Sequence, residues 1–407
     1  MHPAAQPLTD LLLEGVTAGL HPGAQLCVTR HGQPLLDLAV GDNGRGQPMT
    51  PDTLVLWMSS GKPLTAVAIA QLVEAGHVEL DMPIADLLLD FGSHGKDGIT
   101  LRHALNHTAG IRPNPFTYVQ DDWDTIQSKI AAMRPERDWV PGEKAGYHVQ
   151  STWFVLGEVV RIVTGQPLPE YLREHVFLPL GMTDCWLGMD EDAHDDLRHA
   201  GRIASTHWLD PKANVGGRTP VAPALRPSDM TERDWLIHCR PGGNAIGPVH
   251  QFVRFYEALL PDTPTRHDPA GTRDGVTILQ PDTVEQFTAA TRVGMHDHTF
   301  RFIMDWGLGF MRSNNRYASP AQLDTVPYTF GPHTSDDAFG HSGHQSSAAF
   351  ADPAHGLAVA LVFNGMPGEP DHARRSYRLL DQLYQSLGLA PPATPPAPEP
   401  PTPSPAP

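Results

Sequence analysis

Strand-forming segments stand at both ends of this chain, and a long helix-rich stretch separates them. Residues 24–30 and 34–40, joined through His31-Gly32-Gln33, predict a hairpin near the N-terminus. Residues 347–351 and 357–364, with a proline- and glycine-containing turn between them, predict a second hairpin near the C-terminus. The economical packing is one sheet built from both ends of the chain.

Predicted helices at 8–20 and 371–387 would flank this sheet. The expected fold class is therefore α/β (α+β): an antiparallel sheet built from both chain ends, flanked by terminal helices, with a helical region inserted at about 77–240. One domain would span 1–389. Residues 390–407 hold ten prolines, which predicts an extended, disordered tail.

Composition limits the possible partners. The chain has 29 basic and 46 acidic residues, so its formal charge is −17, which argues against nucleic acid and anionic membrane surfaces. Cys27, Cys185 and Cys239 are odd in number and form no disulfide framework. The first residues lack a signal-peptide pattern, and no apolar run is long enough to span a membrane. We therefore expect a soluble, cytoplasmic protein that acts on small molecules; its oligomeric state is open.

A serine and a lysine three residues apart form the first chemical motif. Residues Trp57-Met58-Ser59-Ser60-Gly61-Lys62-Pro63 precede a run at 64–73 that is apolar on every face, which predicts a buried helix. Ser59 then lies in its first turn, with Lys62 on the same face. A serine N–H at a helix start is free to bind an oxyanion. Burial lowers a lysine pKa, so a neutral amine can take the serine proton. A capping serine with a solvated lysine also fits, but an unpaired buried lysine is costly.

Two further motifs follow. Tyr147 stands after Gly146, on a loop before a predicted helix at 152–164, where it could reach the serine oxygen and relay protons. The segment Phe339-Gly340-His341-Ser342-Gly343-His344 is predicted to lie just before a strand. Its glycines would let substrate approach closely, and His341 would orient a carboxylate or the tyrosine oxygen. A packed tyrosine and a turn with chance histidines are the alternatives.

In this order and spacing, the three motifs resemble the serine β-lactamase-like superfamily. That superfamily holds class C β-lactamases, DD-peptidases, family VIII carboxylesterases and acyl transferases. Residues 99–110, the "PLGM" turn within 176–184, and Pro241-Gly242-Gly243 before a predicted helix at 249–260 match as well. The resemblance covers roughly residues 8–388 and implies a β-lactamase/transpeptidase-like fold.

The resemblance also implies roles. Ser59 matches the acylated nucleophile, Lys62 its basic partner and Tyr147 the tyrosine of the Tyr-x-Asn box. His341 replaces the lysine of the Lys-Thr-Gly box and, with Gly343, would orient substrate. The backbone N–H groups of Ser59 and His344 would form the oxyanion hole.

Two departures from the family pattern bear on the substrate. Val149 replaces the asparagine of the Tyr-x-Asn box, and His341 is a weaker charge for a substrate carboxylate than lysine. Both favour an esterase, amidase or acyl-transfer enzyme over an efficient β-lactamase. The predicted function is a serine acyl hydrolase of a small-molecule ester or amide, without a cofactor.

Several other functions stay open. An acyl transferase would pass the acyl group to an alcohol or amine, and a non-catalytic member of the fold would only bind ligand. A Ser-His-Asp triad could use His107, His341 or His344, although no Gly-x-Ser-x-Gly elbow surrounds Ser59. His103 and His107 are spaced as metal ligands on a helix but lack the glutamate of a metalloprotease, so we expect no metal.

Overall fold

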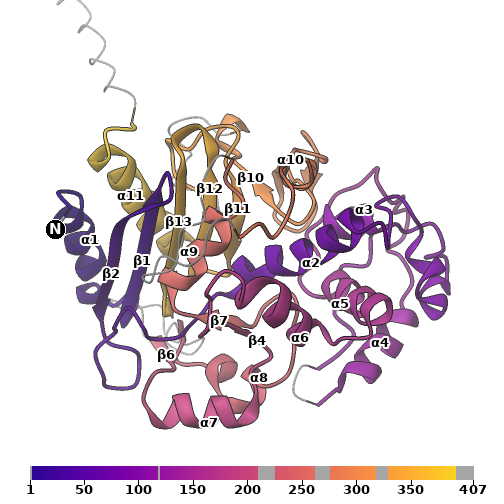
Figure 1. Cartoon of the computed structure of the whole chain (residues 1–407), viewed down its shortest axis with the longest axis horizontal. Coiled ribbons are helices and arrows are strands. Elements are labelled where there is room, and N and C mark those ends of the chain that lie inside the picture. Colours follow the sequence, from indigo (N-terminus) through magenta and orange to yellow (C-terminus); the bar gives the residue numbers. More distant parts are fainter. Residues whose placement is uncertain (1, 118–119, 210–224, 262–275, 318–328, 391–407) are drawn as a thin grey trace, which may run out of the picture.

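A six-stranded antiparallel sheet forms the centre of the molecule, in the order β10-β11-β12-β13-β1-β2. The computed structural model describes residues 2–117, 120–209, 225–261, 276–317 and 329–390. The strands of this sheet are β1 (Gly23–Arg30), β2 (Gln33–Gly41), β10 (Met311–Arg312), β11 (Phe339–Gly343), β12 (Ser347–Asp352) and β13 (Leu357–Phe363). The N-terminal β1 pairs with the C-terminal β13, Cys27 opposite Ala360, which confirms the predicted sheet built from both ends (Figure 1).

Alternation along β13 explains how both faces of the sheet are covered. Leu357, Val359 and Leu361 face the layer of α1 (Ala5–Thr17) and α11 (Glu369–Ser386). The small Ala358 and Ala360 face α9 (Val249–Glu257) on the other side. Successive strand residues point to opposite faces, so one strand serves two cores. The predicted terminal helices are confirmed, and α1 ends before Gly19, whose φ of 69° stops a helix.

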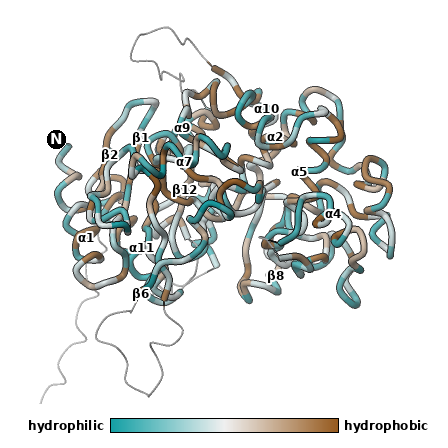
Figure 2. Tube along the Cα trace, turned by 90° about the horizontal axis from the view of Figure 1, so that it is seen from below, coloured by the Kyte–Doolittle hydropathy of each residue, from teal (hydrophilic) through white to brown (hydrophobic). Residues whose placement is uncertain are grey.

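Helix α2 (Lys62–Glu74) lies between the sheet and a helical region (Figure 1). From Lys62 to Ala70 every residue is buried, as the all-round apolar pattern predicts. Around α2 pack α5 (Ser151–Thr164), α6 (Leu168–Leu172) and α10 (Pro281–Thr288). Figure 2 shows the division in the second view: α1 and α11 lie at one end of the molecule, α4 and α5 at the other. The buried apolar residues of α2 all belong to the core that the sheet shares with the helical region.

The remaining elements are short. The other helices are α3 (Leu101–Leu105), α4 (Trp123–Ala131), α7 (Glu191–His199) and α8 (Arg233–Leu236), with a π-helical turn at Arg173–Phe177. Three-residue to four-residue 3-10 turns occur at Met58–Gly61 (η1), Ile84–Asp86, Leu89–Gly92, Asp229–Thr231, Asn315–Tyr317 and Pro353–His355. One small sheet has the order β3 (Val55–Leu56), β7 (Ala245–Gly247) and β4 (Trp186–Leu187). A second has the order β14 (Gly365–Met366), β5 (His207–Leu209) and β6 (Leu225–Pro227). A third consists of β8 (His296–Asp297) and β9 (Phe302–Ile303).

The histidine-containing segment at 339–344 precedes a strand, as the sequence predicts, and most of it also forms a strand of its own. β12 follows at Ser347–Asp352, and Phe339–Gly343 is β11, paired with β10 and β12. Glycine is a poor strand former, and tertiary pairing on both edges overrides that local preference. A side chain at Gly340 would also collide with Phe350 and the carbonyl of Ala349 on β12. The segment that carries His341 and Gly343 is therefore held by pairing within the main sheet.

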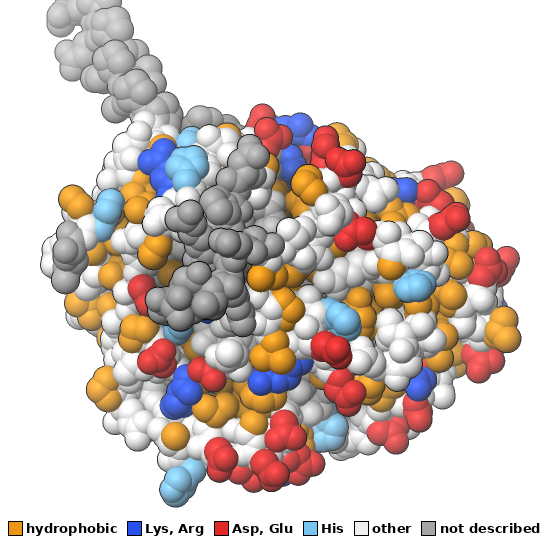
Figure 3. Space-filling view, viewed as in Figure 1, with side chains coloured by type: hydrophobic (Ala, Val, Ile, Leu, Met, Phe, Trp, Pro, Cys, Tyr) orange, Lys and Arg blue, Asp and Glu red, His pale blue; other side chains and the backbone are white. Residues whose placement is uncertain are grey.

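Two further observations concern the predicted partners and the domain limits. Acidic side chains gather over α7 in Figure 3, in keeping with the net charge of −17. Within the described ranges, no helix combines the length and the apolar character needed to cross a membrane. The proline-rich tail lies outside the described residues from 391 onward, and the limits of about 77–240 for a helical insertion stay a prediction.

Candidate active site

Ser59 stands out in its surroundings because it remains accessible. All other residues from Thr53 to Ala70 are buried, whereas Ser59 is half-buried. It is the second residue of the 3-10 turn η1, where a backbone N–H has no acceptor within the helix. Met58 before it has φ of 51°, a left-handed conformation that a non-glycine residue adopts only under constraint. The backbone therefore presents a reactive hydroxyl and a free N–H at the same point.

Neighbouring segments hold this backbone in place. The N–H of Trp57 donates to Ala245 of β7, and its indole donates to Gly247 at 2.9 Å while the ring stacks on Phe252. On the other side, the Ser347 hydroxyl of β12 donates to the Trp57 carbonyl at 2.7 Å. These contacts come from three distant parts of the chain. They fix η1 between the main sheet and the small sheet.

Lys62 is fully buried and touches the serine. Its Nζ lies 2.9 Å from Ser59 Oγ and donates to the carbonyl of Gly242. No carboxylate pairs with it within the described part of the chain, and the only cause acting on its pKa is burial, which lowers the pKa well below the usual lysine value. A neutral amine at hydrogen-bond distance from a hydroxyl is a suitable general base.

Tyr147 lies beside the lysine, on the loop that leads into α5. The Lys62 Nζ is 5.1 Å from the centroid of the Tyr147 ring and 5.6 Å from that of Trp153. The tyrosine ring also lies near Trp306 and Phe300, with centroid distances of 5.8 and 4.8 Å. Structure thus brings together Ser59, Lys62 and Tyr147 as the sequence predicted. The aromatic rings lower the local dielectric around Lys62, which strengthens electrostatic interactions there.

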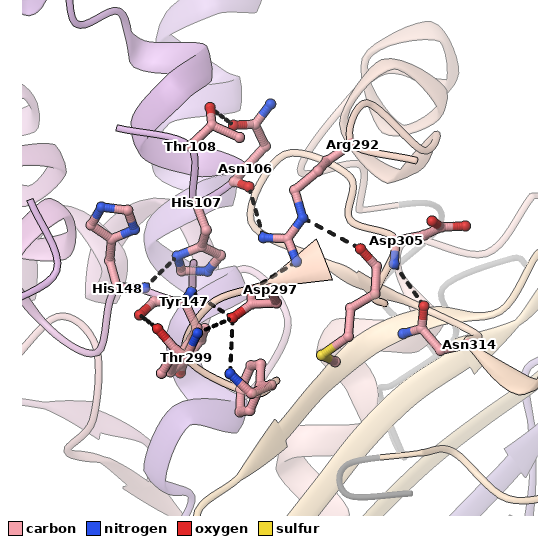
Figure 4. Close-up of polar contacts among 12 residues, drawn as sticks. Asn106, His107, Thr108, Tyr147, His148, Arg292, Asp297, Thr299, Asp305 and Asn314 are labelled. Carbon is pink, nitrogen blue, oxygen red and sulfur yellow. Dashed lines mark hydrogen bonds and ion pairs between the residues drawn. The ribbon is translucent and has the colours of Figure 1, made fainter. Parts of the chain in front are cut away.

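A buried ion pair that the sequence did not reveal anchors Tyr147 (Figure 4). Asp297 Oδ1 accepts the backbone N–H groups of Tyr147, Thr299 and Phe300 at 3.1, 2.8 and 3.0 Å. Asp297 Oδ2 accepts from Arg292 at 2.8 Å, and both side chains are fully buried. Burial lowers the pKa of Arg292 to about 10. Asp297 follows Tyr147 by 150 residues, so no local signal could have linked them.

His341 lies on β11 at the edge of the same cluster. Its ring is 5.9 Å from the Tyr147 ring and 5.3 Å from Trp306, and Nδ1 lies 2.7 Å from the Ser342 carbonyl. Burial, and next the neighbouring Lys62 whenever it is protonated, lower the pKa of His341 well below the usual histidine value. The imidazole is therefore neutral, and not the weak cation considered from the sequence. It can still orient a group by hydrogen bonding.

Gly343 and His344 complete the arrangement. A side chain at Gly343 would lie 2.6 Å from the Trp57 carbonyl and 2.8 Å from Met58 Cβ, so only glycine lets β11 approach the nucleophile segment. His344 follows directly, in the turn between β11 and β12, and its side chain points outward, 3.8 Å from Glu369. Gly343 thus lies against Trp57 and Met58, which directly precede Ser59, and His344 directly follows Gly343. An oxyanion hole requires two such backbone segments side by side.

The rival assignments receive little geometric support. Nδ1 of His107 accepts from the His148 backbone, and His107 is buried against Tyr147 and Trp306. The side chain of His103 instead accepts from the Thr100 backbone at the start of α3. Within the described ranges, no cluster of three histidine, cysteine or acidic side chains could hold a metal ion. Neither a histidine base for Ser59 nor a metal site is assembled from these residues.

Comparisons with known proteins extend over the whole fold. The family model described as "Beta-lactamase" matches residues 8–384. Esterase EstB of Burkholderia gladioli is 33% identical over 377 residues, 85% of this chain and 88% of that protein. A solved penicillin-binding protein homolog from Caulobacter crescentus is 27% identical with a TM-score of 0.72, covering 94% of this chain and 97% of that one. A family VIII carboxylesterase is 25% identical with a TM-score of 0.73, covering 94% and 98%.

Proposed function

This chain belongs to the beta-lactamase family as a serine acyl hydrolase, and we propose that it cleaves small, uncharged carboxylic esters through an acyl-enzyme on Ser59. The observation that carries the proposal is the contact between Lys62 Nζ and Ser59 Oγ at 2.9 Å, with the lysine buried and its pKa lowered. A protonated lysine could not act as a base. Burial without a carboxylate partner is the condition that makes the neutral amine available.

Acylation follows from this arrangement. Lys62 takes the Ser59 proton as Oγ bonds to the ester carbonyl carbon, and the carbonyl electrons move onto oxygen. The backbone N–H groups of Ser59 and His344 would bind that oxyanion, where preorganised donors are most effective. When the tetrahedral intermediate collapses, the departing alkoxide takes the proton back through Lys62 or the neighbouring Tyr147. The product is an alcohol and an acylated Ser59.

Deacylation repeats the steps with water. A water molecule attacks the acyl carbon while its proton passes to Tyr147 or Lys62, and the Ser59 oxygen leaves with a proton. The role of Tyr147 rests on its ring lying 5.1 Å from Lys62 Nζ and on its backbone being fixed by Asp297. In this proposal water is the acceptor. An added alcohol that yields a new ester would identify transfer instead.

The preference for uncharged acyl groups rests on two residues. Val149, at the family's asparagine position, is 40% exposed and offers no amide to a substrate. His341, at the family's lysine position, is buried and neutral. A substrate carboxylate would therefore find no cation at either position. Esters of simple acids need neither contact.

Active-site labelling tests the proposal. A fluorophosphonate should add once to the wild-type protein, and Ser59→Ala should abolish both labelling and hydrolysis of p-nitrophenyl butyrate. Ser60→Ala is the matched control, because the Ser60 hydroxyl is buried and bonded to the His341 carbonyl and Ser347. Labelling should persist in that variant. Label or turnover that survives in Ser59→Ala would refute the assignment.

A further inference from the structure

Arg375 of α11 is a buried cation that forms no ion pair among the described residues, although the charge of Asp371, one turn earlier on the helix, acts on it from beyond ion-pair distance. No carboxylate lies within ion-pair distance of it in the part of the chain that the structure describes. Its guanidinium instead donates to three backbone carbonyls: Leu20 at 2.8 Å, Gln345 at 2.8 Å and Gly365 at 2.6 Å. The group also lies 4.0 Å from the Phe363 ring centroid. A charge buried in this way is expensive, so its position calls for an explanation.

The Gln345 carbonyl belongs to the turn that carries His344. Gln345 has φ of 47°, a left-handed conformation that is strained for a residue with a side chain. Two contacts from the start of α11 hold the same turn. Gly368 N–H donates to Gln345 Oε1 at 2.9 Å, and Glu369 Oε1 lies 3.8 Å from His344 Nδ1. Together with the bond from Arg375, the start and body of α11 therefore make three contacts with residues 344–345.

The same turn contains the backbone N–H of His344. That N–H belongs to the peptide unit whose carbonyl is on Gly343, and the Gly343 carbonyl accepts from Ser346 N–H at 3.2 Å. Ser346 follows Gln345 directly, so the orientation of this peptide depends on the strained residue that Arg375 holds. A donor in an oxyanion hole is effective only when it is fixed before the charge develops.

We propose that Arg375 is a positioning residue for catalysis: it locks the turn at Gln345 and thereby aims the His344 N–H at the oxyanion. The inference rests on the proposed function, because it takes His344 as an oxyanion donor. Arg375 touches no substrate and acts only through the main chain. Its other two carbonyl partners, on Leu20 and Gly365, tie the turn to rigid segments beside β1 and β13.

Arg375→Met and Arg375→Lys test the inference, with Arg378→Met as matched control. Arg378 lies one turn further along α11, but it pairs with Glu14 at 2.7 Å on the surface. Removing an oxyanion donor costs about 10²–10³ in kcat, so a misaimed donor should cost about 10-fold to 100-fold. We expect that loss in kcat of Arg375→Met on p-nitrophenyl butyrate with little change in KM, a smaller loss in Arg375→Lys, and none in Arg378→Met.

A tetrahedral mimic separates positioning from mere stability. The affinity of an alkyl boronic acid, which binds the serine as a tetrahedral adduct, should fall in parallel with kcat in both Arg375 variants. Gln345→Ala loses only the hydrogen bond from Gly368 N–H. Its kcat and its boronic acid affinity should fall together, by less than in Arg375→Met, and this variant replaces Arg375→Met if that one does not fold. Assays are run well below each Tm.

The outcomes distinguish this inference from the proposed function. If the wild-type protein shows no activity that depends on Ser59, the proposed function fails first. Suppose instead that wild-type activity depends on Ser59. If the folded Arg375 and Gln345 variants then keep kcat and boronic acid affinity within twofold of wild type and only their Tm falls, Arg375 merely stabilises the fold and the inference is wrong.

Discussion

Replacing Asp297 by asparagine should destabilise the protein far more than removal of an ordinary ion pair. Asp297 is fully buried, accepts three backbone N–H groups and pairs with the equally buried Arg292 at 2.8 Å. Asparagine keeps an acceptor for some of these donors but removes the ion-pair partner of Arg292, which leaves only the weaker influence of Asp305. The remaining acceptors of Arg292 are the Met304 and Asn106 carbonyls, both at 3.3 Å. An uncompensated buried cation is the main cost.

The size of the effect follows from these contacts. Breaking a buried pair by removing one partner costs about 3–5 kcal/mol. Unfolding entropy is about 2.1 cal/mol/K per residue, or roughly 0.8 kcal/mol/K for a folded domain of this length. Asp297→Asn should therefore lower Tm by about 4–6 °C. Arg292→Met should cost less, because Asp297 would still accept three backbone N–H groups.

Calorimetry and ester kinetics measure both consequences. The matched control is Asp81→Asn, which removes a surface ion pair with Arg102 at 2.6 Å. The Arg102 side chain is 33% exposed and the Asp81 side chain 72%. Exposed pairs contribute at most about 1 kcal/mol, so Tm should change by about 1 °C. Since Asp297→Asn breaks the pair with Arg292 and replaces the carboxylate that accepts the Tyr147 N–H by a weaker amide acceptor, kcat on p-nitrophenyl butyrate should also fall, and in Asp81→Asn it should not.

A particular result would refute the reasoning. If Asp297→Asn and Asp81→Asn change Tm equally, burial does not decide the strength of this pair. If Arg292→Met destabilises more than Asp297→Asn, the three backbone donors do not hold the carboxylate as argued. If Tm falls but kcat is unchanged, the network stabilises the fold without positioning Tyr147.

Three more predictions follow from the site and the fold. Lys62→Met and Tyr147→Phe should each lower kcat at least ~100-fold on one ester, whereas His341→Ala should mainly raise KM. If His341→Ala is inactive while Lys62→Met keeps nearly normal kcat, a histidine is the general base. Short-chain esters should show a kcat/KM far above that of a chromogenic cephalosporin, because neither Val149 nor the neutral His341 binds a carboxylate; similar values would contradict this. Burial, and next the charge of Arg375, lower the pKa of His21 to about 3. Between about pH 3 and 6.5 the unfolded chain therefore binds a proton at His21 that the folded chain does not, so the contribution of His21 to stability falls as pH drops through that window. Other buried histidines such as His341 act in the same direction, so His21→Gln should reduce but not abolish the loss in urea unfolding between pH 7 and 4.5; an unchanged pH dependence would exclude His21 as a source.

Sequence alone determined the features that depend on local geometry or on burial patterns. The i, i+3 spacing puts Ser59 and Lys62 on one face of a helix, wherever that helix lies in the fold. The run after Lys62 is apolar on every side, so the helix has to lie in the protein interior. The continuous apolar run of β13 fits a strand covered on both faces of the sheet. These features need no knowledge of distant residues, because the helix and strand periods are properties of the backbone.

Tertiary structure alone determined the backbone positions and the charge states in the site. Asp297 reaches Tyr147, and Arg375 reaches Gln345, across long stretches of chain with no local pattern to connect them. The neutral state of His341 is likewise invisible in the sequence, since the same residue on an exposed loop would keep its usual pKa. Even the strand β11 depends on partners, because two glycines give it little strand preference of its own. Burial and long-range contact are properties of the assembled fold, and they set the charges and the fixed backbone directions on which the chemistry depends.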